Sequence, residues 1–541
     1  MTTAPRVEPD VSLRKDAPPF ERILIANRGE IALRIIRTCR DLGVQTVAVY
    51  SDADRHAAHV EAADVAVRIG PAPAAESYLR PDAIIDAALS TGARAIHPGY
   101  GFLSERAMFA RQVADAGVVF IGPSVRALES LGDKLAARRS ADAAGVAVVP
   151  GTWEPARFGD DAETDHSLAD AERVGYPLLV KATAGGGGRG MRRVVSAHEL
   201  PAALAAGSAE ALAAFGDGSV YLEREVRPAR HIEVQLLGDD HGSLVALGER
   251  DCSVQRRHQK LVEEAPAPGL TPTERADLHA MAVRAATAAE LSNAATAEFL
   301  FDRDRRFWFL EVNARLQVEH GVTELVTGLD LVAEQLWIAA GQPLSAAVLA
   351  VASEASAPRR HAIEVRLSAE DPAREFAASP GTVGRWVMPG GPGVRVDTAL
   401  RPGDRIPPDY DPMVAKIMTV GEDRDGALAR MRRALDEVEV TGVQTTLPFH
   451  RVLLGDPAFV DVIDLSTDRV ASQWDGEAAR SHAFEAAAVA AADAAARAGQ
   501  AAPPDAGGQR PAAATPSLRK DGSAGGWRAA GRAAATGRWP R

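Results

Sequence analysis

The densest set of reactive side chains lies at positions 311–320, which have the sequence EVNARLQVEH. If this stretch is an extended strand, successive side chains point to opposite faces and one face is wholly apolar. The other face carries an acid, an amide, a cation, an amide and an acid: Glu311, Asn313, Arg315, Gln317 and Glu319. A merely solvated strand face shows the same alternation but usually carries Thr, Ser and Lys. Because every polar group here can ligate a metal ion or an anion, we expect this face to be functional.

Two apolar, aromatic runs accompany this stretch: residues 296–302 (TAEFLFD) and 307–313 (FWFLEVN). The four charged residues 303–306 separate them, which is the signature of a β-hairpin. The predicted register has Asp302 facing Phe307. The hairpin would then hold the polar face on a rigid pair of strands.

In that register Glu298 falls opposite Glu311. Two carboxylates directly opposed across an antiparallel pair destabilise it unless their charge is neutralised. A divalent cation would neutralise them, and Glu298, Glu311 and the side-chain carbonyl of Asn313 are hard oxygen ligands that suit Mg²⁺ or Mn²⁺. A slip of one residue would abolish the pairing.

A glycine-rich hairpin forms a second candidate site. Residues 177–182 (PLLVKA) and 191–195 (MRRVV) are strand-like and flank the loop TAGGGGRG at 183–190. The exposed backbone N–H groups of such a loop can wrap phosphate oxygens. It is not a Walker A loop, since Lys181 precedes the glycines. A flexible linker is the alternative, but linkers do not usually separate two apolar strands. We therefore predict that this hairpin is mobile and binds phosphate.

Two further segments carry cations that suit anions. Lys134 opens an Ala/Arg-rich helix, and a helix start favours anions. Residues 247–264 (LGERDCSVQRRHQKLVEE) mix acids and bases, so they form either ordinary surface ion pairs or a cationic floor for phosphate or bicarbonate. The cations of this segment are Arg250, Arg256, Arg257, His258 and Lys260.

The N-terminal part predicts a parallel α/β sheet. Strand-like runs at residues 22–26 and 46–50 flank a helical pattern, which makes a βαβ unit. The turn Asn27–Glu30 lacks the G-x-G-x-x-G spacing, which argues against a dinucleotide site. Residues 97–102 (HPGYGF) lie at a strand end, where open α/β sheets place ligands.

The remaining segments follow from periodicity and from Pro/Gly content. We expect an irregular linker or surface excursion at 152–173, helices at 271–291 and 323–340, a linker at 347–358, a strand at 362–369, short strands at 380–412 and a helix at 425–438.

Composition excludes several classes of protein. A net charge of -12 argues against general nucleic-acid binding, and no run approaches the length of a membrane span. Cys39 and Cys252 cannot form a disulfide framework, and the N-terminus has no secretory signal, so a cytoplasmic location is expected. Residues 501–541 carry seven Lys or Arg and two Asp, which predicts a disordered basic tail.

From about Ile23 to Val460 the chain resembles the biotin carboxylases of the ATP-grasp superfamily. The motifs that carry this resemblance are IANRGEIALRI, HPGYGFLSE, GDK, KATAGGGGRGM, RHIEVQ, ERDCSVQRRHQK, EEAPAPG, EVNARLQVEH, GLDLV, AGQPL, SPG and YDPMVAK, and their order is specific. The resemblance implies an ATP-dependent carbon–nitrogen ligase. ATP and bicarbonate would give carboxyphosphate and ADP at a magnesium site, and the carboxyl group would pass to biotin on a carrier protein.

The resemblance also implies an α/β and α+β fold in several parts. These are a Rossmann-like N-terminal domain (21–133), an ATP-grasp domain (134–345) with a mobile glycine-rich lid at about 150–225, and a mostly β C-terminal domain (359–470). Composition adds a disordered leader (1–20) before them and an Ala-rich helix with a disordered basic tail (471–541) after them.

The implied roles map onto matching positions of this sequence. ATP phosphates would be held by Lys134, Lys181, Gly187 and Gly188, and the nucleotide pocket would be lined by Glu223, Val226, His231, Gln255, His258 and Leu300. The metal ligands would be Glu298, Glu311 and Asn313. Bicarbonate would be bound by Lys260, Arg315, Gln317 and Val318, with Glu319 as base and Arg366 stabilising the biotin enolate.

The chain departs from the family at Gly321, where many relatives have Pro, and at Ala297, where a larger apolar residue is common. No lysine lies in a Met-Lys-Met context, so the carrier and the carboxyltransferase are expected to be separate proteins. A homodimer is also implied, with Arg37 and Asp41 in a segment that resembles the dimer contact. Another ATP-grasp ligase and an inactive ATP-binding scaffold are the alternatives. The acceptor of the complex stays open among acetyl-CoA, propionyl-CoA, other acyl-CoA and urea.

Overall fold

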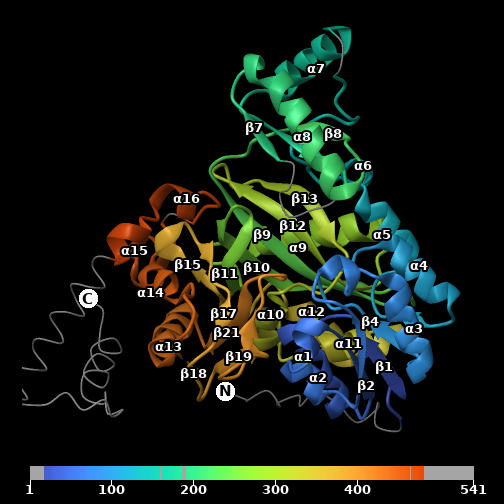
Figure 1. The fold of residues 1–541 in the computed structure, drawn as a ribbon. Helices are drawn as coiled ribbons and strands as arrows, with labels where there is room; N and C mark the ends of the chain where they lie inside the picture. Colours follow the sequence, from blue (N-terminus) through green and yellow to red (C-terminus); the bar gives the residue numbers. More distant parts are fainter. Residues whose placement is uncertain (1–16, 159–160, 185–190, 464, 481–541) are drawn as a thin grey trace, which may run out of the picture.

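The computed structural model describes residues 17–158, 161–184, 191–463 and 465–480. Figure 1 shows a broad body of sheets and helices from which a smaller unit projects. Several predicted features lie outside the described residues. They are the first 16 residues of the predicted leader (1–20), the tail from residue 481, and Gly187 and Gly188 of the glycine loop.

The N-terminal part is a five-stranded parallel sheet in the order β3-β2-β1-β4-β5, which confirms the predicted α/β unit. Strand β1 (Arg22–Ile25) leads into helix α1 (Gly29–Asp41), whose apolar stripe packs on the sheet, and the chain returns as β2 (Gln45–Ser51). The other elements are α2 (Ala58–Ala62), β3 (Val65–Gly70), α3 (Pro81–Thr91), β4 (Ala95–His97), α4 (Ala107–Asp115), β5 (Val119–Phe120), α5 (Val125–Gly132) and α6 (Lys134–Ala143).

The centre of the molecule is an eight-stranded antiparallel sheet in the order β13-β12-β9-β10-β11-β14-β21-β19. It joins strands from the predicted ATP-grasp segment with strands from the predicted C-terminal segment. Its strands are β9 (Ala229–Gly238), β10 (Leu244–Arg256), β11 (Gln259–Ala265), β12 (Asn293–Asp302), β13 (Phe307–Asn313), β14 (His361–Ser368), β19 (Val394–Thr398) and β21 (Met413–Gly421).

The two faces of this sheet are covered by different helices. On one face Arg250 donates a hydrogen bond to Thr323 of α10 (His320–Thr327). On the other face the Glu249 carboxylate accepts from Arg275 of α9 (Pro272–Ala288). Since residues paired across a ladder share a face, the face under α10 also carries the row of acids described below.

The projecting unit is the predicted lid. It contains the three-stranded sheet β7-β6-β8, formed by β6 (Leu178–Ala182), β7 (Arg192–Val194) and β8 (Val220–Arg224). Helices α7 (Asp161–Val174) and α8 (Leu200–Phe215) cover it and share its apolar core (Figure 1). The irregular conformation expected at 152–173 is wrong from Asp161 onward, because the apolar side of α7 packs on the lid sheet, although the segment does lie in a projecting unit.

Two other predicted boundaries are wrong. The single helix expected at 323–340 is two helices, α10 and α11 (Leu331–Ala339). Gly328 ends α10 in the left-handed conformation, φ 78°, and the Asp330 side chain caps α11 by accepting from the Ala333 amide. The linker expected at 347–358 contains helix α12 (Ala346–Glu354), which is capped by Ser345.

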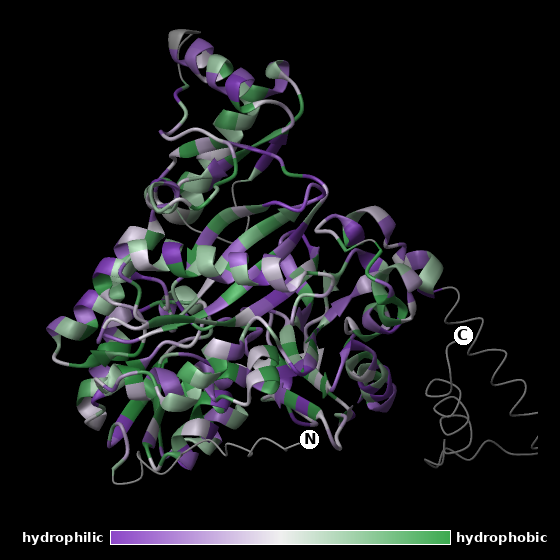
Figure 2. Cartoon of the chain, turned by 180° about the vertical axis from the view of Figure 1, so that it is seen from behind, coloured by the Kyte–Doolittle hydropathy of each residue, from purple (hydrophilic) through white to green (hydrophobic). Residues whose placement is uncertain are grey.

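The C-terminal part packs short strands and helices on β14 and β21 around one apolar core. Its further elements are β15 (Glu370–Asp371), β16 (Ala377–Ala378), β17 (Gly381–Thr382), β18 (Trp386–Val387), β20 (Arg405–Ile406), α13 (Arg424–Glu437), β22 (Glu439–Val440), α14 (Leu447–Gly455), α15 (Pro457–Val460) and α16 (Arg469–Gln473). Figure 2 shows hydrophobic and hydrophilic residues mixed along the outer helices. Within the described part of the chain, no helix has the length and hydrophobicity that a bilayer span requires.

Candidate active site

A row of three carboxylates crosses the edge of the large sheet. Glu298 on β12 pairs with Glu311 on β13 and with Glu233 on β9. The predicted opposition of Glu298 and Glu311 is confirmed. The predicted facing of Asp302 and Phe307 is wrong, since a register shift next to Glu298 pairs Phe301 with Phe307 instead.

Lys260 neutralises this row. Its ammonium donates to Glu233, to Glu298 Oε1 at 3.0 Å and to Glu319 Oε1 at 2.6 Å. Burial alone would lower the pKa of Lys260, but the three carboxylates overcome that effect and raise the pKa well above its usual value. Lys260 is therefore a permanent cation among three acids.

Glu319 lies in the turn before α10 and is completely buried. One carboxylate oxygen accepts from Lys260, and the other accepts from Arg366 Nη2 at 2.9 Å. Burial would raise the pKa of Glu319, but Lys260, Arg366 and the nearby Arg250 hold it well below its usual value. The carboxylate is thus ionised and fixed at both oxygens.

Arg366 is oriented by a second acid. Its Nε donates to Glu263 Oε1 at 2.5 Å, and Glu263 pairs across β11 and β14 with Glu364. Both glutamates are fully buried, and neither oxygen of Glu364 has a hydrogen-bond partner among the described residues. Burial raises the pKa of Glu263 to about 7 even though Arg366 lowers it, and burial also raises the pKa of Glu364.

The raised pKa of Glu263 predicts that this residue destabilises the folded chain increasingly as the pH rises. Below about pH 4.5 both the folded and the unfolded chain hold this proton. Between that pH and about 7 the unfolded chain releases it while the folded chain keeps it, so this group's contribution to stability falls as pH rises. Replacing Glu263 by glutamine should therefore raise the melting temperature relative to wild type more at pH 8 than at pH 5.5. An unchanged difference between the two pH values would contradict the assignment.

The strand predicted over 311–320 ends at Asn313. Beyond it the chain leaves the sheet, because Arg315 turns to Glu105 of the N-terminal part at 3.1 Å and to Gln317 Oε1 at 2.7 Å. The polar side chains still converge. Gln317 donates to Glu298 Oε1 at 3.3 Å, and Asn313 donates to the same oxygen at 2.9 Å.

The predicted phosphate-binding lysines lie at the lid side of this cluster. Lys134, the first residue of α6, is 3.2 Å from Glu311 Oε2. Lys181 on β6 donates to Glu223 Oε1 at 2.6 Å, and Arg138 donates to the other oxygen of Glu223 at 2.6 Å. Burial would raise the pKa of Glu223, but Lys181 and Arg138 lower it below its usual value.

The other predicted pocket residues flank these lysines. His231 on β9 lies 3.0 Å from Glu298 Oε2 and pairs with Leu300 on β12. Gln255 is buried on β10, and Val226 lies just after β8. The Val318 carbonyl accepts from the buried Lys416 at 2.9 Å.

The cations of segment 247–264 lie in two different places. Arg250 and Lys260 lie in the carboxylate cluster. Arg256, Arg257 and His258 instead lie at the turn between β10 and β11, where the two arginines contact Glu375. His258 itself is exposed there.

Glu233 and Glu263 belong to this cluster but were not among the predicted site residues. Glu233 accepts from Arg250 Nε at 2.6 Å and from Lys260, and Glu263 holds Arg366. The alternation of the run HIEVQ would have placed Glu233 on the face of Glu298.

The opposed acids fit a divalent cation. Glu298, Glu311 and Asn313 offer carboxylate and amide oxygens, the donor set that Mg²⁺ and Mn²⁺ prefer. Their charge is at present offset by Lys260 and Lys134.

Gly321 on α10 is explained by its packing. A Cβ built at this position would lie 2.3 Å from Met418 Sδ and 3.5 Å from Glu364 Oε2. The absence of a side chain therefore makes room for the buried Met418 against the start of α10.

Three family models match the chain in succession. They are the biotin carboxylase N-terminal domain (residues 19–128), the carbamoyl-phosphate synthase L chain ATP-binding domain (133–347) and the biotin carboxylase C-terminal domain (364–471). Two relatives are named biotin carboxylase. The one from Pseudomonas aeruginosa is 51% identical over 440 residues, 81% of this chain and 96% of that protein. The one from Nostoc is 48% identical over 441 residues, 82% and 96%.

Two solved structures are also similar to this chain. A biotin carboxylase–β,γ-ATP complex from Campylobacter jejuni has a TM-score of 0.79 and 42% identity, covering 84% of this chain and 98% of that chain. The biotin carboxylase domain dimer of the Hydrogenobacter thermophilus 2-oxoglutarate carboxylase, in complex with MgADP and bicarbonate, has a TM-score of 0.79 and 43% identity, covering 84% and 97%. By its sequence, its fold and the order of its domains, this chain belongs to the biotin carboxylase family.

Proposed function

We propose that this enzyme is the biotin carboxylase subunit of an acyl-CoA carboxylase complex, in which it uses ATP and bicarbonate to carboxylate biotin on a separate carrier protein. The observation that carries the assignment is the buried Glu319 carboxylate, held by Lys260 and Arg366 beside the opposed Glu298 and Glu311. An acid, an anion-binding cation and a metal-binding pair thus lie in one cluster.

The first step joins two anions, so positive charge must offset their repulsion. We assign Lys134 and Lys181 to the ATP phosphates, since both reach the cluster from the lid side. Gly187 and Gly188 would cover the phosphates from the loop between them. Glu298, Glu311 and Asn313 would hold Mg²⁺ or Mn²⁺, which when bound offsets phosphate charge.

Bicarbonate would bind among Lys260, Arg315, Gln317 and the Val318 backbone. Glu319, whose pKa is held well below its usual value, takes the proton of bicarbonate as a bicarbonate oxygen attacks the terminal phosphorus of ATP, giving carboxyphosphate and ADP. The carboxyl group then passes to the ureido nitrogen of biotin, the phosphate that leaves takes the N–H proton of that nitrogen, and the Arg366 guanidinium stabilises the charge that develops on the ureido oxygen.

We place ATP beside a set of residues that lie on β8, β9, β10 and β12 or just beyond a strand end. The set is Glu223, Val226, His231, Gln255, His258 and Leu300. The partly separate core of the lid supports its closure over bound nucleotide.

The partners follow from the reaction. The carrier brings biotin, and a carboxyltransferase selects the final acceptor: acetyl-CoA, propionyl-CoA, another acyl-CoA or urea. A homodimer is supported by the exposed Arg37 and Asp41 on α1 and by the dimer named for the Hydrogenobacter domain. A cytoplasmic location fits Cys39 and Cys252, which are both buried and unpaired.

The test is ADP release by the purified chain with Mg²⁺ and ATP. We expect turnover to require bicarbonate, to rise with free biotin and to disappear on chelation of Mg²⁺. ATP cleavage that is indifferent to bicarbonate would indicate another ATP-grasp ligase. Nucleotide binding without any turnover would indicate an inactive scaffold.

A further inference from the structure

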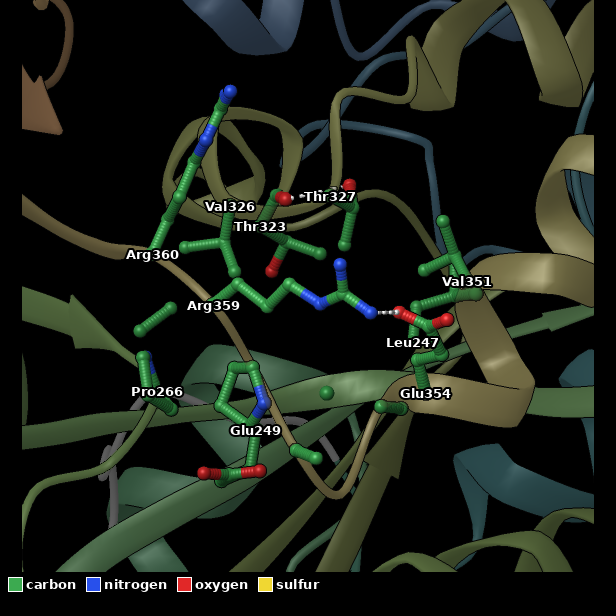
Figure 3. A pocket seen from close by; sticks show the side chains of 15 residues that line it. Leu247, Glu249, Pro266, Thr323, Val326, Thr327, Val351, Glu354, Arg359 and Arg360 are labelled. Atoms are coloured by element: carbon green, nitrogen blue, oxygen red, sulfur yellow. Dashed lines mark hydrogen bonds and ion pairs between the residues drawn. The ribbon is translucent and has the colours of Figure 1, made fainter. Parts of the chain in front are cut away.

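A cavity of about 250 Å³ lies outside the carboxylate cluster (Figure 3). Its walls come from β10, the end of β11, helix α10, helix α12 and the segment that leads into β14. None of Glu233, Lys260 and Glu319 lines it. The assigned roles of the active site therefore leave this cavity without an occupant.

The interior of the cavity is mostly apolar. Leu247, Ala265, Pro266, Val326, Val351, Ala355, Ala357 and Pro358 contribute to its walls. Glu249 is the acid that lines it from β10, but its carboxylate is engaged by Arg275 at 2.6 Å and by His279 at 2.8 Å. The charge of Glu249 is thus already offset from the α9 side.

The rim of the cavity is cationic. Arg359 reaches across to Glu354, with Nη2 3.2 Å from Oε2, as the dashed line in Figure 3 shows. The neighbouring Arg360 makes no ion pair with any residue in the described part of the chain. Two guanidinium groups against one carboxylate leave a net positive charge beside an apolar space.

The cavity is connected to the catalytic cluster through one side chain. Thr323, which lines it from α10, accepts a hydrogen bond from Arg250 Nη1 at 2.8 Å. The fully buried Arg250 also donates to Glu233, the acid that holds Lys260. Helix α10 begins at the residue after Glu319. A displacement of α10 would therefore reach both Lys260 and Glu319.

We propose that this cavity is a regulatory site for a small carboxylate with an apolar tail. Its carboxylate would pair at the rim with Arg359, whose guanidinium lies over the cavity, the exposed Arg360 would add positive charge there, and its tail would lie against Val326, Val351 and Pro358. A cavity of about 150 Å³ accommodates benzene, so the present volume suits a ligand of about ten non-hydrogen atoms. Because the tail would contact Val326 on α10, the helix that carries Thr323 and follows Glu319, its binding would change bicarbonate-dependent turnover.

Octanoate is the probe, and octylamine is the control for charge. Calorimetry on the full chain should detect octanoate and no comparable binding of octylamine. The variant Arg360→Glu should weaken octanoate binding by about twofold to fivefold, the range for an exposed charge, whereas Arg94→Glu, an exposed arginine elsewhere, should not change it. Neither arginine belongs to the catalytic cluster, so turnover without octanoate should be equal in both variants.

A second variant tests the cavity itself. Ala355→Phe places a ring in the cavity and should abolish both octanoate binding and its effect on turnover. Failure of octanoate to bind wild type, or equal binding to wild type and Arg360→Glu, overturns the proposal. Binding at the cavity without any change of turnover overturns its regulatory part. Octanoate binding is measured without ATP, so the binding result does not depend on whether the chain carboxylates biotin. The regulatory part rests on the proposed function.

Discussion

Replacement of Glu319 by glutamine is expected to lower bicarbonate-dependent ADP release by about 10² to 10⁴-fold, the usual contribution of a general base. The carboxylate accepts from Lys260 and Arg366, and the amide keeps one acceptor but turns an NH₂ donor toward a cation. It can neither accept the proton of bicarbonate nor balance both cations. The measurement is the rate of ADP formation with saturating ATP, Mg²⁺ and bicarbonate.

The matched control is Glu129→Gln, an exposed glutamate in a surface ion pair with Arg111. It should keep wild-type turnover, because exposed ion pairs contribute little. Binding of MgATP to Glu319→Gln should stay close to wild type, since Glu319 contacts none of the proposed phosphate ligands. Turnover within a factor of about three of wild type would exclude Glu319 as the base.

The fold around the site follows from local patterns in the sequence. Two aromatic runs with a four-residue charged turn predicted the hairpin, and the opposed Glu298 and Glu311 followed from its register. The pairing of Glu298 with Glu311 was predicted correctly partly because two deviations from the predicted register cancel each other. The predicted register was wrong at the turn, where Phe301 rather than Asp302 faces Phe307, and one extra residue on β13 restored the alignment at Glu298.

Irregularities of this kind explain what simple alternation misses. Lys260 and Glu263 are three residues apart, so an ideal strand would place them on opposite faces. A register shift between β10 and β11, with Val254 opposite Val262 and Gln255 opposite Lys260, leaves Leu261 as an extra residue. The shift brings Lys260 to the face of Glu233. Nothing in the local composition announces such a bulge.

Helix ends and tertiary contacts account for the other differences. The break between α10 and α11 depends on the left-handed Gly328 and on the Asp330 cap. The apolar periodicity of 323–340 continues across both residues and therefore predicted a single helix. The strand ends at Asn313 because Arg315 contacts Glu105, which lies 210 positions away in the sequence. A contact between residues so far apart in the sequence forms only when the chain is folded, so local sequence patterns do not predict it.

The second large effect is expected at Lys260. Replacing it by methionine leaves Glu233, Glu298 and Glu319 without their shared cation in a buried site. Removal of one partner from a buried ion cluster typically costs about 3–5 kcal/mol of unfolding free energy. Loss of a cation aimed at reacting anions lowers turnover by about 10² to 10³-fold. Urea unfolding and ADP release measure the two effects on the same samples.

The pH dependence separates this electrostatic loss from a simple packing defect. In wild type Lys260 lowers the pKa of Glu298 and Glu319, so their stabilisation is present at neutral pH and is lost only as the solution becomes strongly acidic. In Lys260→Met the same carboxyls should hold protons more tightly than in the unfolded chain, so their contribution falls as pH rises. The gap in melting temperature should therefore be wider at pH 8 than at pH 5.5. Lys260→Arg, which keeps the charge, should narrow the gap at pH 8, and a pH-independent gap would show that packing alone is lost.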